Sequence, residues 1–367
     1  MKYERIPKTD IKVSKIGFGT RTLNTRPESL EYSQKLIDSA IDLGINFFVT
    51  TAHYSNGQIE ERLGHLLSGI RDKVVVSTSG GISHKNGKII VDSSRQALEK
   101  SIQTSLNRLQ TDYLDHFEIH IYDPFTPLEE TLGFLREYMD SDIIRSVGTS
   151  SFQPEILKRW EEHLPTSLVQ LPLNPMQQKA YQLALPACQE FEIGLTIYGA
   201  FFMGLFCSSI NKTPETIDQR INAPTEWTKC LINLNQALTE QSQETGLRMS
   251  ELILNWVLSH DCITSVLVGT NNIDHLKENV SVFESPASLS TIEETAKIIR
   301  SNYERLYPKI LPKFEQVVKT IKKISPNNYA IISDLGIKVS VPRFYPPGTK
   351  LYFDIETAEV LDYDPPS

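Results

Sequence analysis

The stretch "NFFVTTAHYSNGQIEERLG", Asn46 to Gly64, contains one complete structural unit. It begins with apolar residues that are typical of a buried strand, passes through the polar turn "SNGQ", and enters the amphipathic start of a helix. Units of this kind build parallel sheets, because each helix returns the chain to the start of the next strand. The number of such units therefore decides the architecture.

The same strand–helix unit recurs eight times. Strand-like runs occupy residues 15–19, 45–49, 73–79, 112–120, 144–150, 168–173, 194–199 and 264–269. Helical patterns follow at residues 29–43, 59–67, 93–109, 128–138, 154–163, 181–191 and 272–280, with two further helices expected between the last two strands. The strands read as near-continuous apolar runs, as expected when both faces of a sheet are covered. Eight units predict an α/β fold, the (β/α)8 or TIM barrel.

The two ends of the chain lie outside this repeat. Residues 1–14, "MKYERIPKTDIKVS", predict a β-hairpin that closes the bottom of the barrel. From residue 325 the chain is rich in β-branched and aromatic residues and has turn signals at "DLG", "YPPG" and "IET", which predict three or four short strands. We therefore divide the chain into a barrel at residues 1–320 and a β-rich C-terminal extension at residues 325–367. The extension could pack on the barrel, act as a lid, mediate self-association or bind a protein partner.

The composition excludes several classes of partner. The chain has 367 residues, is 40% hydrophobic and carries a formal net charge of −8. Nucleic acids and anionic membranes both attract cationic surfaces, so neither is expected as a partner. The longest apolar run, residues 193–207, is too short to span a bilayer and contains three glycines. The first ten residues lack the apolar centre of a secretory signal.

The cysteines indicate a reducing compartment and no structural metal. Cys188, Cys207, Cys230 and Cys262 are widely spaced and form no CxxC pair, whereas disulfide and zinc frameworks need closer spacing. The histidines also lack an i,i+4 pair. We therefore expect a cytoplasmic protein with free thiols and no metal site.

The barrel prediction brings distant residues to one site. In such barrels the functional site lies at the C-terminal ends of the strands. The residues at these ends, one from each strand, are Gly19, Val49, Ser79, His120, Thr149, Leu171, Tyr198 and Gly269. We expect them to surround a single mouth.

Several of these segments resemble the aldo-keto reductase family. The similarity covers residues 1–300 and includes "KYERIPKTDIKVSKIGFGT", "RLQTDYLDHFEIH", "VGTSSFQPEIL" and "VLVGTNNIDHLKENV" in the family's order. The resemblance implies a nicotinamide cofactor, NADP or NAD, and a catalytic Asp-Tyr-Lys-His tetrad. In that tetrad the tyrosine donates a proton to a carbonyl while hydride arrives from the cofactor, the lysine lowers the tyrosine pKa, and the aspartate holds the lysine.

The tetrad is only half present in this chain. Tyr54 stands at the tyrosine position and His120 at the histidine position, whereas Val49 replaces the aspartate and Ser79 replaces the lysine. Removing one member of a buried ion pair strands a charge at a cost of about 3–5 kcal/mol, so the paired loss is a coherent change. Without the lysine, we expect the Tyr54 pKa to stay near or above its ordinary value. Ordinary carbonyl reduction should then be slow.

The resemblance also implies a set of cofactor contacts. Tyr198 matches the aromatic residue that stacks on the nicotinamide, and Gln170 and Ser150 match its carboxamide contacts, although Ser151 stands where asparagine is usual. The full candidate set is Gly19, Thr20, Ser150, Ser151, Gln170, Tyr198, Gly269, Thr270, Asn271, Glu278 and Asn279. No Lys or Arg occurs in "GTNNIDH", residues 269–275, so a strong clamp for the 2′-phosphate of NADP is not evident. NADP is slightly preferred through the resemblance alone.

Three further residues are candidate contacts for a small-molecule substrate. Arg21 could anchor a carboxylate or phosphate, since arginine makes bidentate contacts to such groups, or it could be a surface residue paired with a loop acid. His53 could line the mouth or be merely solvated, and Phe201 could form an apolar wall or pack beneath its loop. An anionic substrate follows if Arg21 serves as the anchor.

Three functions remain open on these residues. The first is a repurposed nicotinamide-dependent oxidoreductase that uses Tyr54 and His120 to reduce an activated C=C or C=N bond, or catalyses dehydration or isomerisation. The second is a catalytically silent protein that binds a cofactor or metabolite and engages a partner through residues 325–367. The third is an ordinary NADPH-dependent carbonyl reductase, which the missing lysine disfavours.

Overall fold

The computed structural model of the 367-residue chain describes residues 1–23, 29–85, 88–150, 154–210, 225–306, 313–325, 328–333, 338–341, 350–354 and 360–364. Within these ranges no helix is long and apolar enough to cross a membrane. The same residues contain no cluster of three or more His, Cys, Asp or Glu side chains that could hold a metal ion.

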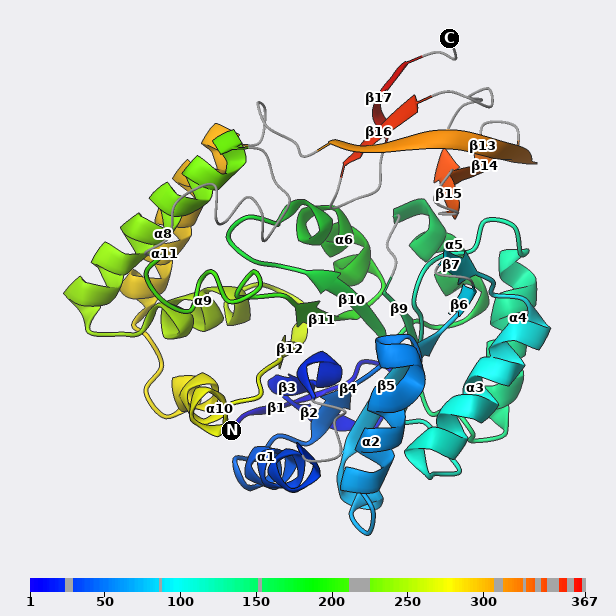
Figure 1. Ribbon diagram of the computed structural model, residues 1–367, viewed down its shortest axis with the longest axis horizontal. Coiled ribbons are helices and arrows are strands. Elements are labelled where there is room, and N and C mark those ends of the chain that lie inside the picture. Colours follow the sequence, from blue (N-terminus) through cyan, green and yellow to red (C-terminus); the bar gives the residue numbers. More distant parts are fainter. Residues whose placement is uncertain are drawn as a thin grey trace.

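Eight parallel strands close into the barrel that the sequence predicts (Figure 1). Around the barrel they are β3 (Ile16–Gly19), β4 (Phe47–Val49), β5 (Val75–Gly80), β8 (His116–Ile119), β9 (Val147–Thr149), β10 (Leu168–Pro172), β11 (Gly194–Tyr198) and β12 (Ile263–Val268). β12 pairs with β3, where Val266 lies opposite Ile16, and this pairing closes the barrel. All eight C-terminal strand ends therefore face the same side.

The helices form the outer layer of the barrel (Figure 1). The principal ones are α1 (Leu30–Asp42), α2 (Gln58–Leu66), α3 (Arg95–Leu109), α4 (Leu128–Asp140), α5 (Pro154–His163), α6 (Lys179–Glu190), α8 (Thr225–Thr245), α9 (Met249–Leu258), α10 (Ile273–Val280) and α11 (Leu289–Leu306). Short 3-10 turns occur at η1 (Thr20–Thr22), η3 (Tyr54–Gly57), η4 (Arg71–Lys73) and η5 (Ser281–Phe283). The two helices expected before the last strand are α8 and α9. α11 lies beyond the predicted repeat and was not expected.

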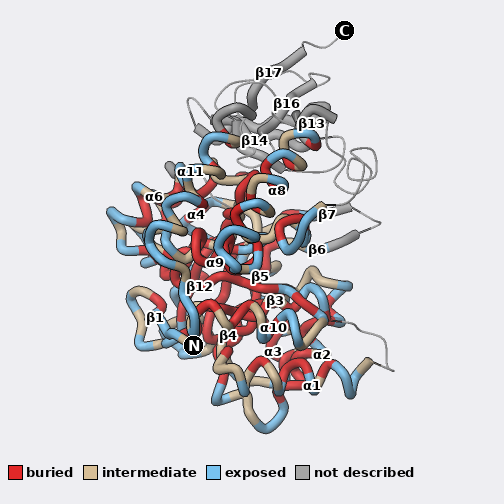
Figure 2. The backbone as a smooth tube through the Cα atoms, turned by 90° about the vertical axis from the view of Figure 1, so that its left-hand side faces the viewer, coloured by how far each residue is buried: buried red, intermediate tan, exposed pale blue. Residues whose placement is uncertain are grey.

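Two sets of apolar side chains lie on the two faces of the barrel sheet. The outer set packs between strands and helices and includes Phe18, Phe48 and Phe117. The inner set contains Phe47, Val75, Leu168 and Leu267, and the N-terminal segment contributes Ile6 and Val13 to it. Figure 2 shows how completely the barrel strands are buried.

The N-terminal hairpin closes the barrel bottom as predicted. Its strands are β1 (Tyr3–Arg5) and β2 (Lys12–Ser14), which pair antiparallel. Ile6 and Val13 are fully buried in the inner set. Apolar side chains from the hairpin therefore fill the lower end of the barrel, and the site is confined to the upper end.

The barrel strands are less apolar than the sequence analysis predicts. β5 carries buried Ser77, Thr78 and Ser79, and β8 carries buried His116 and Glu118. Thr78 points outward to Glu60 of α2, whereas most of these polar residues lie on the inner face. Polar residues there are expected where function overrides packing.

The C-terminal region forms a separate five-stranded antiparallel sheet, and four of its strands lie within residues 325–367, where three or four were predicted. The strands are β13 (Lys313–Ser325), β14 (Asn328–Ser333), β15 (Lys338–Val341), β16 (Lys350–Asp354) and β17 (Val360–Asp364), in the order β15-β14-β13-β16-β17. β13 begins before residue 325, where the extension was expected to start. Its run "VKTIKKI" was not predicted as a strand, because its lysines interrupt the apolar signal.

A second hairpin was not predicted. β6 (Ile82–Lys85) and β7 (Lys88–Val91) pair antiparallel directly after barrel strand β5. Ile82 lies opposite Val91, so the hairpin turns back toward α3. It extends one wall of the region next to the mouth.

Candidate functional site

Val49 ends β4 on the inner face of the barrel. It is 6% exposed and belongs to the inner apolar set with Phe47 and Leu267. Its carbonyl accepts a hydrogen bond from Thr20 Oγ1 at 3.1 Å. The position where the resemblance implies a carboxylate is therefore an apolar contact, and an uncompensated charge there would be costly.

Tyr54 is presented by a left-handed turn immediately after β4. Ser55, Asn56 and Gly57 have φ values of 47°, 53° and 89°. Such a conformation is unfavourable for non-glycine residues, at about 1–3 kcal/mol each, and persists only where neighbouring structure enforces it. Strain of this kind is common at functional sites.

Arg108 of α3 holds this turn in place. Its Nη2 donates to the Asn56 carbonyl at 3.4 Å, and its Nη1 pairs with Glu60 Oε2 at 3.2 Å. A side chain at Gly57 would collide with the guanidinium. Glu60 is fully buried and also accepts a hydrogen bond from Thr78 Oγ1 at 2.7 Å, so α2, α3 and β5 together fix the turn.

His120 follows β8 and is bonded to Ser79. The distance from Ser79 Oγ to His120 Nδ1 is 3.0 Å, and His120 N donates to the Gly80 carbonyl at 3.0 Å. Ser79 is 3% exposed on β5. The residue at the lysine position thus contacts the imidazole directly, which sequence reasoning did not foresee.

His53 joins Tyr54 and His120 in a group of three rings. The ring centroid of His53 lies 6.2 Å from that of Tyr54 and 6.0 Å from that of His120. Of the two readings that the sequence left for His53, the structure supports a place at the mouth.

The electrostatic surroundings keep both candidate catalytic groups neutral. Burial raises the pKa of Tyr54, the Arg21 cation acts to lower it, and the Glu118 carboxylate raises it further. The raised pKa of Tyr54 agrees with the expectation from sequence that this pKa stays near or above its ordinary value. Burial, assisted by His53, lowers the pKa of His120 to about 4. At neutral pH the site therefore offers a phenol and a neutral imidazole, which suit hydrogen bonding better than strong acid catalysis.

Arg21 lies exposed in the turn η1, within electrostatic reach of Tyr54. Among the residues that the structure describes, no carboxylate pairs with its guanidinium.

The candidate nicotinamide contacts lie on neighbouring strands. Gln170 is on the inner face of β10, opposite Thr196 of β11, and its buried Oε1 finds no hydrogen-bond partner within the described part of the chain. Tyr198 ends β11 and is 42% exposed. A buried acceptor without a partner beside an exposed ring fits a planar ligand that carries an amide.

The remaining nicotinamide-side candidates are Ser150, Ser151, Gly19 and Gly269. Ser150 follows β9 and donates its backbone N–H to the Ile119 carbonyl at 3.0 Å, and Ser151 lies outside the described residues. Gly19 and Gly269 approach closely, since a Cβ on Gly269 would lie 3.4 Å from the Gly19 carbonyl. Leu171 differs from the expectation: its side chain packs outward against the helices.

The candidate adenine-side residues surround the start of α10. Thr270 Oγ1 accepts from Asn272 N at 3.0 Å, and Asn272 caps the helix by accepting from Asp274 N at 2.8 Å. Asn271 is exposed, and Asn279 is buried. Glu278 lies 3.6 Å from Arg248, a partner that sequence reasoning missed.

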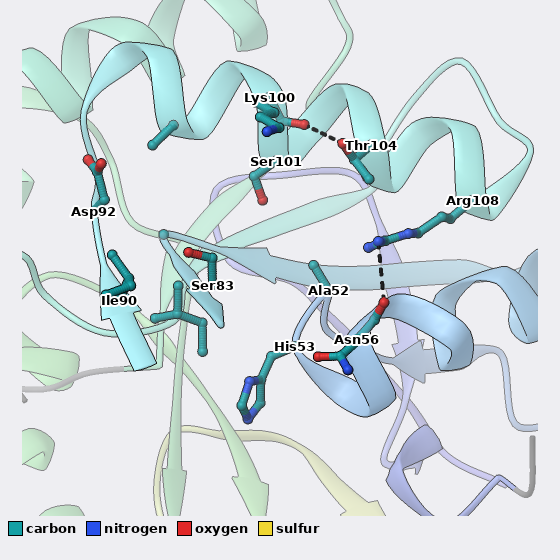
Figure 3. Close-up of a pocket in the computed structure, with 13 residues that line it drawn as sticks. Ala52, His53, Asn56, Ser83, Ile90, Asp92, Lys100, Ser101, Thr104 and Arg108 are labelled. Atoms are coloured by element: carbon teal, nitrogen blue, oxygen red, sulfur yellow. Dashed lines mark hydrogen bonds between the residues drawn. The ribbon is translucent and has the colours of Figure 1, made fainter. Parts of the chain in front are cut away.

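A cavity of about 350 Å³ opens beside the mouth (Figure 3). Lys100, Ser101 and Thr104 of α3 form one wall, and His53 and Asn56 face them from the Tyr54 turn (Figure 3). The unpredicted hairpin supplies Ile82, Ser83 and Ile90. His53 thus belongs both to the cavity and to the three-ring group. Phe201 is half-buried and packs against the outer core, as Tyr54 does.

Three functional neighbours escaped the sequence analysis: Arg108, His116 and Glu118. The alternation "HFEI" in β8 carried a signal, because two polar residues at a spacing of two share one face of a strand. No comparable signal marks Arg108, whose contact with Gly57 depends on the packing of α3 against the turn.

Comparison with known proteins gives a consistent picture. The sequence profile of the "Aldo/keto reductase family" matches residues 15–300. Aldo-keto reductase YhdN of Bacillus subtilis (strain 168) is 29% identical over 76% of this chain and 87% of its own length. An L-glyceraldehyde 3-phosphate reductase of Escherichia coli O157:H7 is 29% identical over 81% of this chain and 91% of its own.

Two further relatives extend the comparison. Aldo-keto reductase yakc [NADP(+)] of Schizosaccharomyces pombe is 26% identical over 79% of this chain and 92% of its own length. The solved structure of the glycerol dehydrogenase AKR11B4 from Gluconobacter oxydans superposes with a TM-score of 0.75, at 25% identity, over 85% of this chain and 98% of that one.

Proposed function

The chain belongs to the aldo/keto reductase family of oxidoreductases, and from that premise we propose that it is a nicotinamide-dependent enzyme whose site works without the family's Asp-Lys pair. The observation that carries this proposal is the hydrogen bond between Ser79 Oγ and His120 Nδ1 at 3.0 Å. It gives the serine at the lysine position a defined task, which a merely decayed site would not require.

The proposed role of Ser79 is to set the tautomer of His120. A hydroxyl that donates to Nδ1 leaves the second ring nitrogen of His120 protonated and able to donate to a substrate. Tyr54 remains a phenol because burial raises its pKa. Two neutral hydrogen-bond donors then face the mouth.

Neutral donors favour substrates that do not develop a full alkoxide. The bound cofactor would supply the hydride. Reduction of a C=C bond conjugated to a carbonyl spreads the negative charge, and hydride transfer to an already protonated C=N bond cancels its positive charge, so both need less help from an acid. Dehydration or isomerisation of a related substrate would use the same two donors.

The residues present fit a nicotinamide cofactor. Gln170, Ser150 and Tyr198 would hold the nicotinamide, and Gly19 and Thr20 would line the same end of the barrel. Thr270, Asn271, Glu278 and Asn279 would contact the adenine side. The yeast relative carries NADP(+) in its name, so we propose NADP in preference to NAD.

We propose a small anionic substrate. Arg21 would bind its carboxylate or phosphate, since guanidinium groups contact such anions in a bidentate manner. The E. coli relative is named for a phosphorylated aldehyde, which supports the same class. The cavity beside His53 would receive the remainder of the molecule.

Two variants test the assignment of the catalytic residues. Tyr54→Phe and His120→Ala should each lower kcat/KM by about 10²–10⁴-fold, because each removes a positioned donor. Tyr181→Phe, on α6 away from the three-ring group, is the matched control and should leave kcat/KM unchanged. Full activity of both site variants on the native substrate would refute these roles.

A second candidate function is cofactor or metabolite binding without turnover. The apolar contact of Val49, where the family resemblance implies a carboxylate, favours it. A partner would then engage the β-rich extension at residues 325–367. Saturable cofactor binding with no turnover, together with a partner that deletion of this extension abolishes, would establish this second candidate.

A further inference from the structure

His116 and Glu118 form a buried pair on the inner face of β8. Phe117 packs in the outer core, so its two neighbours along the strand point into the barrel. His116 is fully buried and Glu118 is 2% exposed. In the strand register Ser77 lies opposite His116 and Ser79 lies opposite Glu118.

The hydrogen bonds of His116 fix where one of its protons lies. Ser146 Oγ donates its only hydrogen to the Asp115 carbonyl at 2.7 Å, because a carbonyl can only accept. The contact between Ser146 Oγ and His116 Nδ1 at 2.8 Å must therefore use a proton on Nδ1. The other ring nitrogen, Nε2, lies 3.4 Å from Glu118 Oε1.

These two facing atoms need a proton between them. Neither His116 Nε2 nor Glu118 Oε1 has another hydrogen-bond partner within the described residues, and both are buried. Two bare lone pairs facing each other in a low-dielectric interior repel, and each would also lose its solvation. Gly148 lies opposite on β9, where a Cβ would come within 2.7 Å of His116 Nε2, so no side chain there satisfies either atom.

We propose that His116 and Glu118 share one proton, and that this dyad replaces the missing Asp-Lys pair as the buried charged unit beside the site. A proton on His116 Nε2 makes the contact a charge-assisted hydrogen bond between imidazolium and carboxylate, and a proton on Glu118 makes it a neutral O–H···N hydrogen bond; either removes the repulsion. The catalytic role of the dyad rests on the proposed function. The shared proton itself would exist whether or not the protein is an active enzyme.

The carboxylate of the dyad lies closer to the mouth of the barrel than the imidazole does. Glu118 lies two residues nearer the C-terminal end of β8 than His116 does, beside Ser79, so the carboxylate end faces the reacting groups. A lysine at position 79 would favour the ionised form of Tyr54, whereas the carboxylate of Glu118 disfavours that form. Glu118 and His116 would thus be positioning residues that hold Tyr54 as a hydrogen-bond donor.

Few other titratable groups share this environment. Arg21 and Glu118 act electrostatically on Tyr54, and His53 acts on His120. The strands on either side of the dyad present Ser77 and Ser79 from β5 and Gly148 from β9, none of which titrates near neutral pH. A substitution of Glu118 should therefore change the pKa of Tyr54 directly.

The first test is ¹⁵N NMR of the histidine-labelled full-length protein. We expect both ring nitrogens of His116 to report a bound or shared proton from pH 6 to 8. Two results together would overturn the proposal: ¹⁵N spectra that show an unprotonated His116 Nε2 without a hydrogen bond at pH 7, and ¹³C spectra that show an ionised Glu118 carboxylate. This experiment uses the unsubstituted chain, so no variant needs to fold.

The second test measures ionisation of Tyr54 by ¹³Cζ-tyrosine NMR. Glu118→Gln should lower the Tyr54 pKa, because it removes the carboxylate that raises this pKa. Glu251→Gln, which alters a buried acid on α9, should leave it unchanged. An unchanged pKa in Glu118→Gln would refute the role of the dyad. Failure of the proposed function would appear separately, as absence of cofactor binding.

Discussion

Ser79 and Val49 lie on adjacent strands of the barrel, where Val49 is opposite Ser77, and their side chains make different kinds of contact. Val49 packs among apolar side chains, whereas Ser79 bonds the candidate catalytic imidazole. Restoring the lysine alone would remove the Ser79–His120 hydrogen bond and would place a cation opposite Glu118, whose carboxylate already faces His116. The two positions are therefore coupled and should be changed together.

The double variant Val49→Asp/Ser79→Lys tests this coupling. It restores the buried ion pair, so it should gain reduction of simple aldehydes with NADPH, while each single variant should be destabilised by about 3 kcal/mol or more. Aldehyde-dependent NADPH oxidation and urea unfolding measure the two effects. If the single variants are as stable as the parent and the double variant remains inert, the two positions are not coupled in this way.

His120 should make the protein acid-labile. Its pKa in the folded protein is about 4, below the ordinary value of 6.5, so the unfolded chain binds the proton more readily. Its contribution to stability is complete above pH 6.5 and is lost as the pH falls toward 4, by about 3 kcal/mol in all. Burial lowers the pKa of His260 too, and this adds to the slope.

His120→Gln isolates this effect. Urea unfolding between pH 7 and pH 4 should show a shallower loss of free energy in this variant than in the parent. His275→Gln, on the exposed side of α10, serves as the control and should follow the parent. Identical pH profiles for His120→Gln and the parent would show that the imidazole is not protonated more easily on unfolding.

The turn that carries Tyr54 depends on an element far along the chain. Arg108 of α3 bonds the Asn56 carbonyl and pairs with buried Glu60, and these contacts stabilise two consecutive left-handed residues. The turn is thus positioned by helix packing rather than by its own sequence. Its geometry should be sensitive to α3.

Arg108→Met should destabilise the protein by about 3 kcal/mol, because it leaves the Glu60 carboxylate buried without its cation. Arg95→Met removes an exposed pair with Glu137 from the same helix and should change stability little. Chemical unfolding of both variants measures the difference. Equal stabilities would show that Arg108 does not hold the turn.

Across the whole molecule, the barrel could be predicted because it depends on local periodicity. Alternating strands and helices, such as the run from Phe47 to Leu66, are visible residue by residue, and the barrel rule then places Tyr54 and His120 at one end. The strands of the hairpin β6–β7 were missed because each has only four residues, and β13 was missed because lysines separate its apolar residues.

The site was only partly predictable for a different reason. The resemblance identified which positions matter, but contacts between strands depend on register and side-chain packing. The Ser79–His120 bond and the His116–Glu118 contact arise from cross-strand geometry that no local pattern encodes. The unexpected functional features therefore lie where the sequence rules for barrel strands are broken.

Binding of the nicotinamide cofactor tests the central claim most directly. Calorimetric titration of the full-length protein with NADPH and with NADH should give saturable binding of at least one, with NADPH the tighter. Tyr198→Ala should weaken binding by about 5- to 150-fold, because stacking on an aromatic ring contributes roughly 1–3 kcal/mol. Absence of binding by both cofactors would contradict the proposal of a nicotinamide-dependent oxidoreductase.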